Sequence, residues 1–180
     1  YLQKKKKDTG RTMVFAGRER HASARYHNLG YPTRALRTKD FLYIRNFRPE
    51  RWPAGDPCAI DKNGKTGAMH SAYHDIDQCP AWDFIVANRD DREIYPYFLK
   101  AAGKRPYEEL YNVSSDPGCL HNLIGNGKYT EKLNNLRKEM DKLLKKTKDT
   151  RYLDDPTQDD IWETYPRLSG AMRTFPEPLF

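Results

Sequence analysis

Four short segments of the chain have the residue pattern of β-strands. Residues 12–16 form an apolar run after a polar lead, residues 33–38 alternate, and residues 41–46 are rich in aromatic and branched side chains. Residues 109–113 alternate polar and apolar positions, as a strand with one buried face does. Because only two residues separate the second segment from the third, these two should form an antiparallel hairpin.

The clearest helical period lies in residues 129–147. Apolar residues recur there in steps of three and four, which places them on one face of a helix: Tyr129, Leu133, Leu136, Met140, Leu143 and Leu144. Shorter helices are predicted for residues 82–88 and 93–102. We expect the apolar face of the long helix to face a sheet built from the four strand segments.

The remaining segments predict loops and one domain boundary. Residues 17–32 and 47–80 carry glycine, proline and polar side chains with little periodicity. A loop as long as the second is usually functional or docked on another surface. We expect one folded unit over residues 1–152, and an extended tail over residues 153–180 that packs on it.

Charge is unevenly distributed along the 180 residues. Residues 1–56 hold 14 Lys or Arg and 5 Asp or Glu, a net charge of +9, whereas residues 57–180 carry −2. The basic part suits an anionic partner such as nucleic acid, a membrane surface or a sulfated glycan, although a solvated surface explains it equally well. No apolar run approaches the roughly 18 residues that a transmembrane helix needs. The chain begins at Tyr1, and we expect it to be part of a longer protein.

Few residues suggest a metal or a nucleophile. The three cysteines, Cys58, Cys79 and Cys119, form no CxxC pair. His70 and His74 have the spacing of two ligands on a helix, but Gly67 and Ser71 make that segment a poor helix. The acidic pairs at residues 90–91, 154–155 and 159–160 lie in polar turns, where solvated carboxylates are common. We expect no metal site in the chain.

One cluster stands out from this background. Arg18, Glu19, Arg20 and His21 follow Gly17 directly after the first strand, which we expect to end in a sharp turn at this glycine. Arginine forks match sulfate, phosphate or carboxylate through two parallel hydrogen bonds. Ordinary surface ion pairs remain an alternative interpretation of these residues.

Several stretches taken together resemble type I sulfatases, and most closely the heparan N-sulfatase (N-sulphoglucosamine sulphohydrolase) branch. They are GRERH at 17–21, NLGYPTRALRT at 28–38, YIRNF at 43–47, RWPAGDP at 51–57, RPYEELYNVSSDPGCLHNL at 105–123 and ETYP at 163–166. The resemblance implies that residues 1–152 are a C-terminal subdomain of α+β fold, in which a long C-terminal helix packs on a small antiparallel sheet of about four strands. It also implies that this subdomain docks on a larger domain of alkaline-phosphatase-like fold.

The same resemblance implies which domain of such an enzyme carries the catalytic groups and which carries substrate-binding residues. The larger N-terminal domain would carry calcium and a formylglycine made from a cysteine in a C-x-P-S-R motif. None of the three cysteines here fits that motif, so we expect no catalytic residue, no metal ligand and no activity from this chain alone. Substrate-binding residues are expected at Arg18, Glu19, Arg20 and His21.

The resemblance also implies partners and a location. The partners are the N-terminal sulfatase domain and a sulfated amino sugar or glycan of the N-sulfoglucosamine kind, with a homo-oligomer left open and with neither nucleic acid nor membrane. An exported enzyme is implied, in the periplasm, outside the cell or in a lysosome. The alternative is a stand-alone basic module that binds a polyanion or glycan without catalysis.

Overall fold

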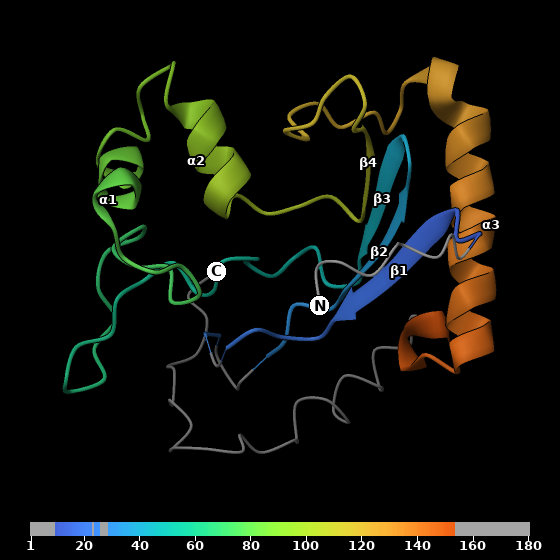
Figure 1. Ribbon diagram of the computed structural model, residues 1–180. Coiled ribbons are helices and arrows are strands. Elements are labelled where there is room, and N and C mark those ends of the chain that lie inside the picture. Colours follow the sequence, from blue (N-terminus) through green and yellow to red (C-terminus); the bar gives the residue numbers. More distant parts are fainter. Residues whose placement is uncertain (1–9, 23, 26–28, 154–180) are drawn as a thin grey trace, which may run out of the picture.

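The computed structural model describes residues 10–22, 24–25 and 29–153 (Figure 1). Its four strands form one sheet in the order β1-β2-β3-β4, and every neighbouring pair is antiparallel. The elements are β1 (Met13–Arg18), β2 (Thr33–Thr38), β3 (Phe41–Asn46), α1 (Pro80–Ala87), α2 (Tyr95–Ala102), β4 (Glu108–Asn112), η2 (Gly127–Tyr129), α3 (Thr130–Thr147) and η3 (Thr150–Leu153). The expected α+β fold, a small antiparallel sheet with a long helix, is confirmed.

Helix α3 covers one face of the sheet (Figure 1). Its apolar face meets alternate residues of the strands in a single core, because side chains of a strand point to opposite faces in turn. The buried members of this core are Leu36, Tyr43, Phe47, Leu110, Leu133, Leu136, Met140 and Leu144, and Leu143 packs beside them half-buried. The predicted inward face of the helix is therefore confirmed.

Helices α1 and α2 lie on the other side of the sheet from α3 (Figure 1). They form a second, smaller core with the long segment that follows β3, whose members Ala54 and Tyr73 pack with Phe98 and Ala102 of α2. This segment contains only one isolated bridge, between Ile60 and Thr66. The loop expected over residues 47–80 is thus folded against α1 and α2.

The expected end of the first strand at Gly17 is wrong. Strand β1 continues through Gly17 and Arg18, which pair with Arg34 and Thr33 of β2. A Cβ atom added at Gly17 would lie 2.8 Å from Cδ of Arg34, closer than real Cβ contacts allow. Glycine therefore serves here to admit the Arg34 side chain across the two strands, and no turn is formed.

The C-terminal tail expected over residues 153–180 lies, except for Leu153, outside the described residues. The last described element is η3, in which the Arg151 side chain is buried. Over the described parts of the chain, no helix combines the length and the apolar character needed to cross a membrane.

Candidate functional site

A cleft lies on the face of the sheet that α3 leaves uncovered. Strand register places Ala35, Ile44 and Glu109 in one row across β2, β3 and β4, and all three line this cleft. The opposite wall comes from residues 53–54 and 75–76 and from the end of α2. Its volume of about 390 Å³ falls within the usual range for sites that bind small ligands.

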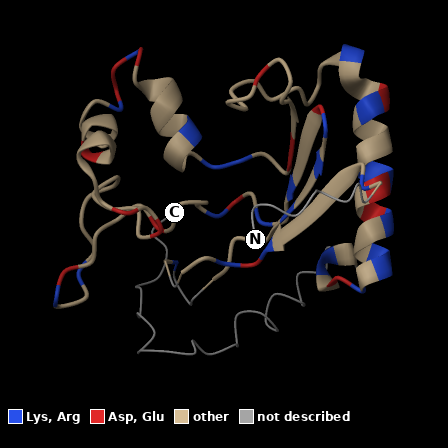
Figure 2. Cartoon of the chain, viewed as in Figure 1, with Lys and Arg blue, Asp and Glu red and all other residues tan. Residues whose placement is uncertain are grey.

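Two guanidinium groups and one imidazole line the cleft. Arg18 is the last residue of β1 and is exposed, and Arg105 lies on the connection from α2 to β4. Figure 2 shows basic segments at both of these places. His21 follows shortly after β1, and its side chain is 70% exposed. The Arg105 guanidinium also donates to the carbonyl oxygens of Leu99 and Lys100 at the end of α2. The three groups supply the lining of the cleft with donors that suit an anion.

A buried carboxylate holds His21 in place. Oδ1 of Asp75 lies 2.8 Å from Nδ1 of His21, and the Asp75 side chain is only 6% exposed. A carboxylate accepts hydrogen bonds, so Nδ1 carries the hydrogen and Nε2 is left for another partner. Oδ2 of Asp75 also lies 3.8 Å from Nη2 of Arg25, whose pKa is lowered by burial to about 10. His21 is thus an oriented group on the cleft wall.

The floor of the cleft is polar and buried. Asn46 donates from Nδ2 to Oε1 of Glu109 at 2.7 Å, and the hydroxyl of Tyr111 donates to Oε2 of the same carboxylate at 2.5 Å. The hydroxyl of Tyr31 is buried and no described residue lies within hydrogen-bonding distance of it. Burial raises the pKa of Tyr31 to about 12. An unpaired buried hydroxyl is uncommon, and here it borders the cleft.

Glu19 lies apart from the cleft. Its carboxylate accepts hydrogen bonds from Nη2 of Arg34 at 2.6 Å and from Nη2 of Arg151 at 2.7 Å. Arg34 in turn binds both oxygens of Asp149. Burial alone would lower the pKa of Arg34, but its hydrogen bonds to Asp149 and Glu19 outweigh burial and raise it. Glu19 therefore ties β1 and β2 to the segment after α3.

The four predicted binding residues are thus divided. Arg18 and His21 share the cleft, Glu19 belongs to the ion-pair network, and Arg20 is half-buried and is not among the residues that line the cleft. Asp75 and Arg105 escaped the sequence reasoning. Arg105 opens the RPYEELY stretch and could have been noticed there, whereas Asp75 follows no pattern because only folding brings it to His21.

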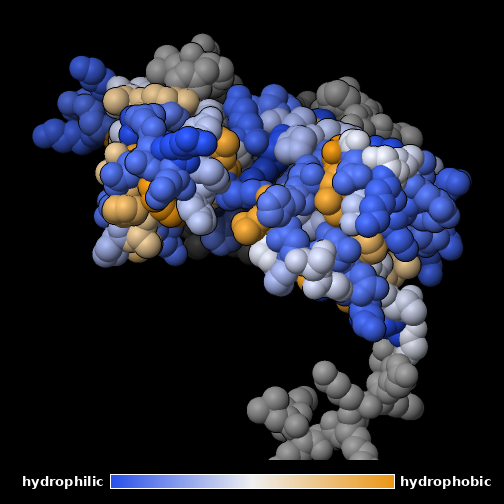
Figure 3. Space-filling view, turned by 90° about the horizontal axis from the view of Figure 1, so that it is seen from above, coloured by the Kyte–Doolittle hydropathy of each residue, from blue (hydrophilic) through white to orange (hydrophobic). Residues whose placement is uncertain are grey.

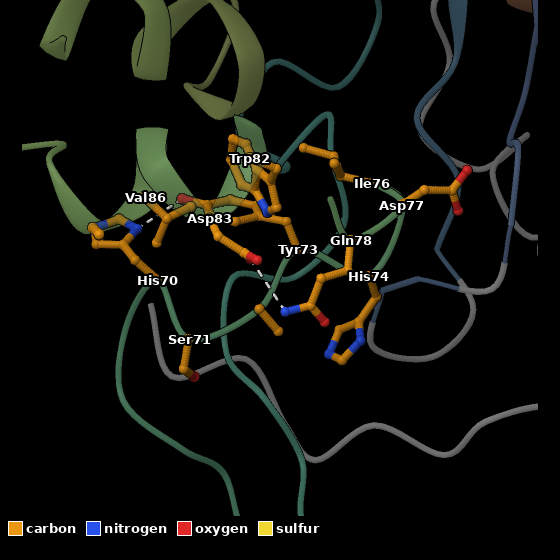
Figure 4. Close-up of a pocket in the computed structure, with 12 residues that line it drawn as sticks. His70, Ser71, Tyr73, His74, Ile76, Asp77, Gln78, Trp82, Asp83 and Val86 are labelled. Atoms are coloured by element: carbon orange, nitrogen blue, oxygen red, sulfur yellow. Dashed lines mark hydrogen bonds between the residues drawn. The ribbon is translucent and has the colours of Figure 1, made fainter. Parts of the chain in front are cut away.

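His70 and His74 line a second cleft, formed by residues 70–78 and α1 (Figure 4). Nδ1 of His70 lies 2.7 Å from the Tyr73 hydroxyl, and Nε2 of His74 lies 2.9 Å from the carbonyl oxygen of Cys58. Burial lowers the pKa of His70. Within the described ranges, no group of three His, Cys, Asp or Glu side chains is placed to hold a metal ion. The acidic pairs at 154–155 and 159–160 lie outside those ranges.

Comparison with known proteins places this geometry in context. No protein-family model matches the chain. Over 111 residues the chain is 34% identical to an ulvan-active sulfatase from Formosa agariphila. The chain is related to sulfatases. The matched stretch covers 62% of this chain and 16% of that protein, so the chain spans a small part of its relative. The sheet with its long helix is consistent with a C-terminal sulfatase subdomain.

Proposed function

We propose that this chain is the C-terminal subdomain of a sulfatase, and that the cleft between the sheet and α2 holds part of the sulfated sugar. The observation that carries this proposal is the convergence of Arg18, Arg105 and the oriented His21 on one cleft, in a chain related to sulfatases. Sulfate needs fork donors, which the two arginines supply.

Each group in the cleft has a chemical task in this proposal. Arg18 and Arg105 bind anionic oxygens, and Nε2 of His21 contacts the sugar or its sulfate. The unpaired Tyr31 hydroxyl offers a hydrogen-bonding group to a sugar hydroxyl. Glu19 has a positioning role, because its bonds to Arg34 and Arg151 fix the chain just after Arg18.

The hydrolytic chemistry belongs, in this proposal, to the rest of the enzyme. Calcium and the formylglycine nucleophile would lie in an N-terminal domain, and this chain alone would turn over no aryl sulfate. The gene provides the test: the reading frame upstream of the codon for Tyr1 should encode a C-x-P-S-R motif. A complete short reading frame that begins near Tyr1, with no such motif before it, would contradict the proposal.

The substrate we propose is a sulfated amino sugar or glycan, of the N-sulfoglucosamine kind that the sequence resemblance implies. The relative is named for activity on ulvan, so a sulfated glycan is the part of this proposal that both lines of argument share. Comparing kcat/KM of the parent enzyme for N-sulfoglucosamine and for O-sulfated sugars decides whether the substrate is an N-sulfated amino sugar or another sulfated glycan. We also propose that the enzyme is exported, as the resemblance implies.

A docking face for the N-terminal domain is offered by α1 and α2. Helix α1 buries no residue although most of its side chains are apolar, and Phe84 is 56% exposed. Tyr95, Tyr97 and Leu99 of α2 are exposed as well. Figure 3 shows hydrophobic residues at the surface of the part of the molecule that contains α1 and α2. Exposed apolar patches mark interaction sites, and most of the relative's length has no counterpart in this chain.

The basic amino-terminal part supports a second candidate function, that of a module which binds polyanions without catalysis. The net charge of +9 over residues 1–56 favours it. Such a module would bind heparin and duplex DNA alike, with affinity falling steeply as salt rises. The sulfatase proposal instead expects recognition of a single sulfated sugar, which Arg18→Ala weakens and for which duplex DNA does not compete.

A further inference from the structure

The second cleft adjoins the first. Ile76 lines both of them, and the segment of residues 70–78 runs from one to the other. The volume of the second cleft is about 460 Å³, again in the range of ligand sites. A sugar chain that enters the first cleft can therefore continue into the second along this segment.

The two clefts differ in charge. The first is lined by Arg18 and Arg105, whereas no lysine or arginine is among the residues that line the second. The second instead presents the carboxylate of Asp83 and the amide of Gln78, whose Nε2 donates to Oδ1 of Asp83 at 3.2 Å (Figure 4). Asp77 also lines this cleft, but its carboxylate points away from Asp83 and Gln78 (Figure 4). Carboxylates repel a sulfate group and accept hydrogen bonds from hydroxyls.

An aromatic ring is held rigidly at the edge of the second cleft. The Trp82 ring stacks on Phe98 with centroids 6.5 Å apart and meets the edge of Tyr73 at 5.4 Å. Trp82 still lines the cleft and keeps part of its surface accessible. An aromatic surface beside carboxylate and amide groups suits the apolar face and the hydroxyl rim of a neutral sugar ring.

We propose that the second cleft binds an unsulfated sugar unit, next to the sulfated unit in the first cleft. The substrate of the enzyme is then an oligosaccharide with a sulfated and a neutral unit side by side. This inference rests on the proposed function, because the first cleft must hold the sulfated unit. Because the Asp83 carboxylate repels sulfate from the second cleft, the two clefts together select a glycan by the position of its sulfate groups.

Nuclear magnetic resonance on the 180-residue chain tests the inference, with two probes. N-acetylglucosamine is neutral and should shift the indole resonance of Trp82 and the side-chain amide of Gln78. N-sulfoglucosamine should shift the guanidinium resonances of Arg18 and Arg105 instead. Asp83→Ala should weaken binding of the neutral sugar about tenfold, because it removes a charged acceptor. Asp90→Ala is the matched control: its side chain is 90% exposed and lies outside the cleft lining, so binding should not change.

The outcomes separate the inference from the proposed function. If the neutral sugar leaves Trp82 and Gln78 unshifted, or if N-sulfoglucosamine shifts them equally, the inference is overturned. An equal loss of binding in Asp83→Ala and Asp90→Ala overturns it too. If N-sulfoglucosamine leaves Arg18 and Arg105 unshifted, the proposed function fails, while the neutral-sugar footprint still decides what the second cleft binds.

Discussion

At the scale of single residues, the contact between Gly17 and Arg34 organises the ion pairs that join β1 and β2 to the segment after α3. Gly17 pairs with Arg34 across β1 and β2, and the missing Cβ leaves room for the arginine to reach both Glu19 and Asp149. Arg34 is itself 5% exposed, so its guanidinium cannot move aside into water. The position of Arg18, one residue further along β1, depends on this packing.

Gly17→Ala should therefore destabilise the fold. The new methyl group overlaps the Arg34 side chain, and overpacking of this kind costs roughly 1–3 kcal/mol. Urea denaturation followed by circular dichroism measures the change. Gly127→Ala is the control, because nothing lies within 4 Å of a Cβ at that position and its φ is not left-handed. Equal stability of both variants would show that Arg34 tolerates the methyl group.

The sequence allowed us to predict some of the residues that line the cleft, but not which distant residues they or their neighbours bind. Arg18 and His21 were singled out because basic residues after a strand suit an anion, and both line the cleft. Their role as substrate-binding residues stays a prediction. Glu19 was grouped with them by proximity in sequence, yet its partner Arg151 is more than a hundred residues away. Such distant pairing is set by the tertiary fold.

At the scale of elements, helix α3 was the most predictable part. Its period of three and four residues arises from one buried face, and that face alone determines which side chains meet the sheet. The strands were predicted within two residues. Residues 33–38 and 109–113 were found by alternation, which reports a buried face directly, and the other two segments by their apolar, aromatic and branched side chains. The end of β1 was missed because Gly17 was interpreted as a turn residue, although a close side chain accounts for it.

Leu136→Ala tests the packing of α3 on the sheet. Leu136 is 4% exposed in the centre of the core, so truncation removes buried contacts and leaves a cavity. The expected cost is about 2–5 kcal/mol of unfolding free energy. Lys138→Ala on the exposed side of the same helix should change stability by less than about 0.5 kcal/mol. A small loss for Leu136→Ala would mean that α3 does not pack as described.

The link between β4 and α3 is expected to depend on pH. Burial alone would raise the pKa of Glu108, but hydrogen bonds from Arg137 of α3 and from Tyr43 outweigh burial and lower it. A carboxyl group whose pKa is lower in the folded state stabilises that state above its unfolded pKa. This stability is lost as pH falls through the folded value.

Acid denaturation of Glu108→Gln tests this link. The variant should be less stable than the wild type at pH 7, and its stability should fall less steeply between about pH 5 and pH 2. Parallel acid curves for the wild type and Glu108→Gln would show that Glu108 gains nothing from Arg137 on folding.

At the scale of the whole molecule, two small cores frame the clefts. One joins the sheet to α3, and the other joins α1 and α2, on the other side of the sheet, to the segment after β3 (Figure 1). The first cleft lies between the sheet and the second core, since Ala54 and Ile76 line it. The spacing of apolar residues in α3 and in the strands predicted the first core. It could not indicate the second, because the segment that builds it has no regular period and is ordered only by contacts with distant residues such as Phe98.

The selectivity of the parent enzyme shows whether Arg18 binds the sulfated sugar while hydrolysis occurs on groups outside this chain. Arg18→Ala should lower kcat/KM for N-sulfoglucosamine about 10- to 100-fold, the usual effect of losing one charge-assisted contact. Turnover of a small aryl sulfate should stay within about threefold of wild type, because it needs no contact with the cleft.

Arg37→Ala is the matched control for this measurement, since Arg37 is exposed on β2 and is not among the residues that line the cleft. It should leave kcat/KM for both substrates unchanged. A selective loss on the sugar substrate in Arg18→Ala, absent in Arg37→Ala, is the result the cleft predicts. Unchanged kcat/KM for the sugar in Arg18→Ala, or an equal loss on both substrates, would contradict a substrate-binding role for this cleft.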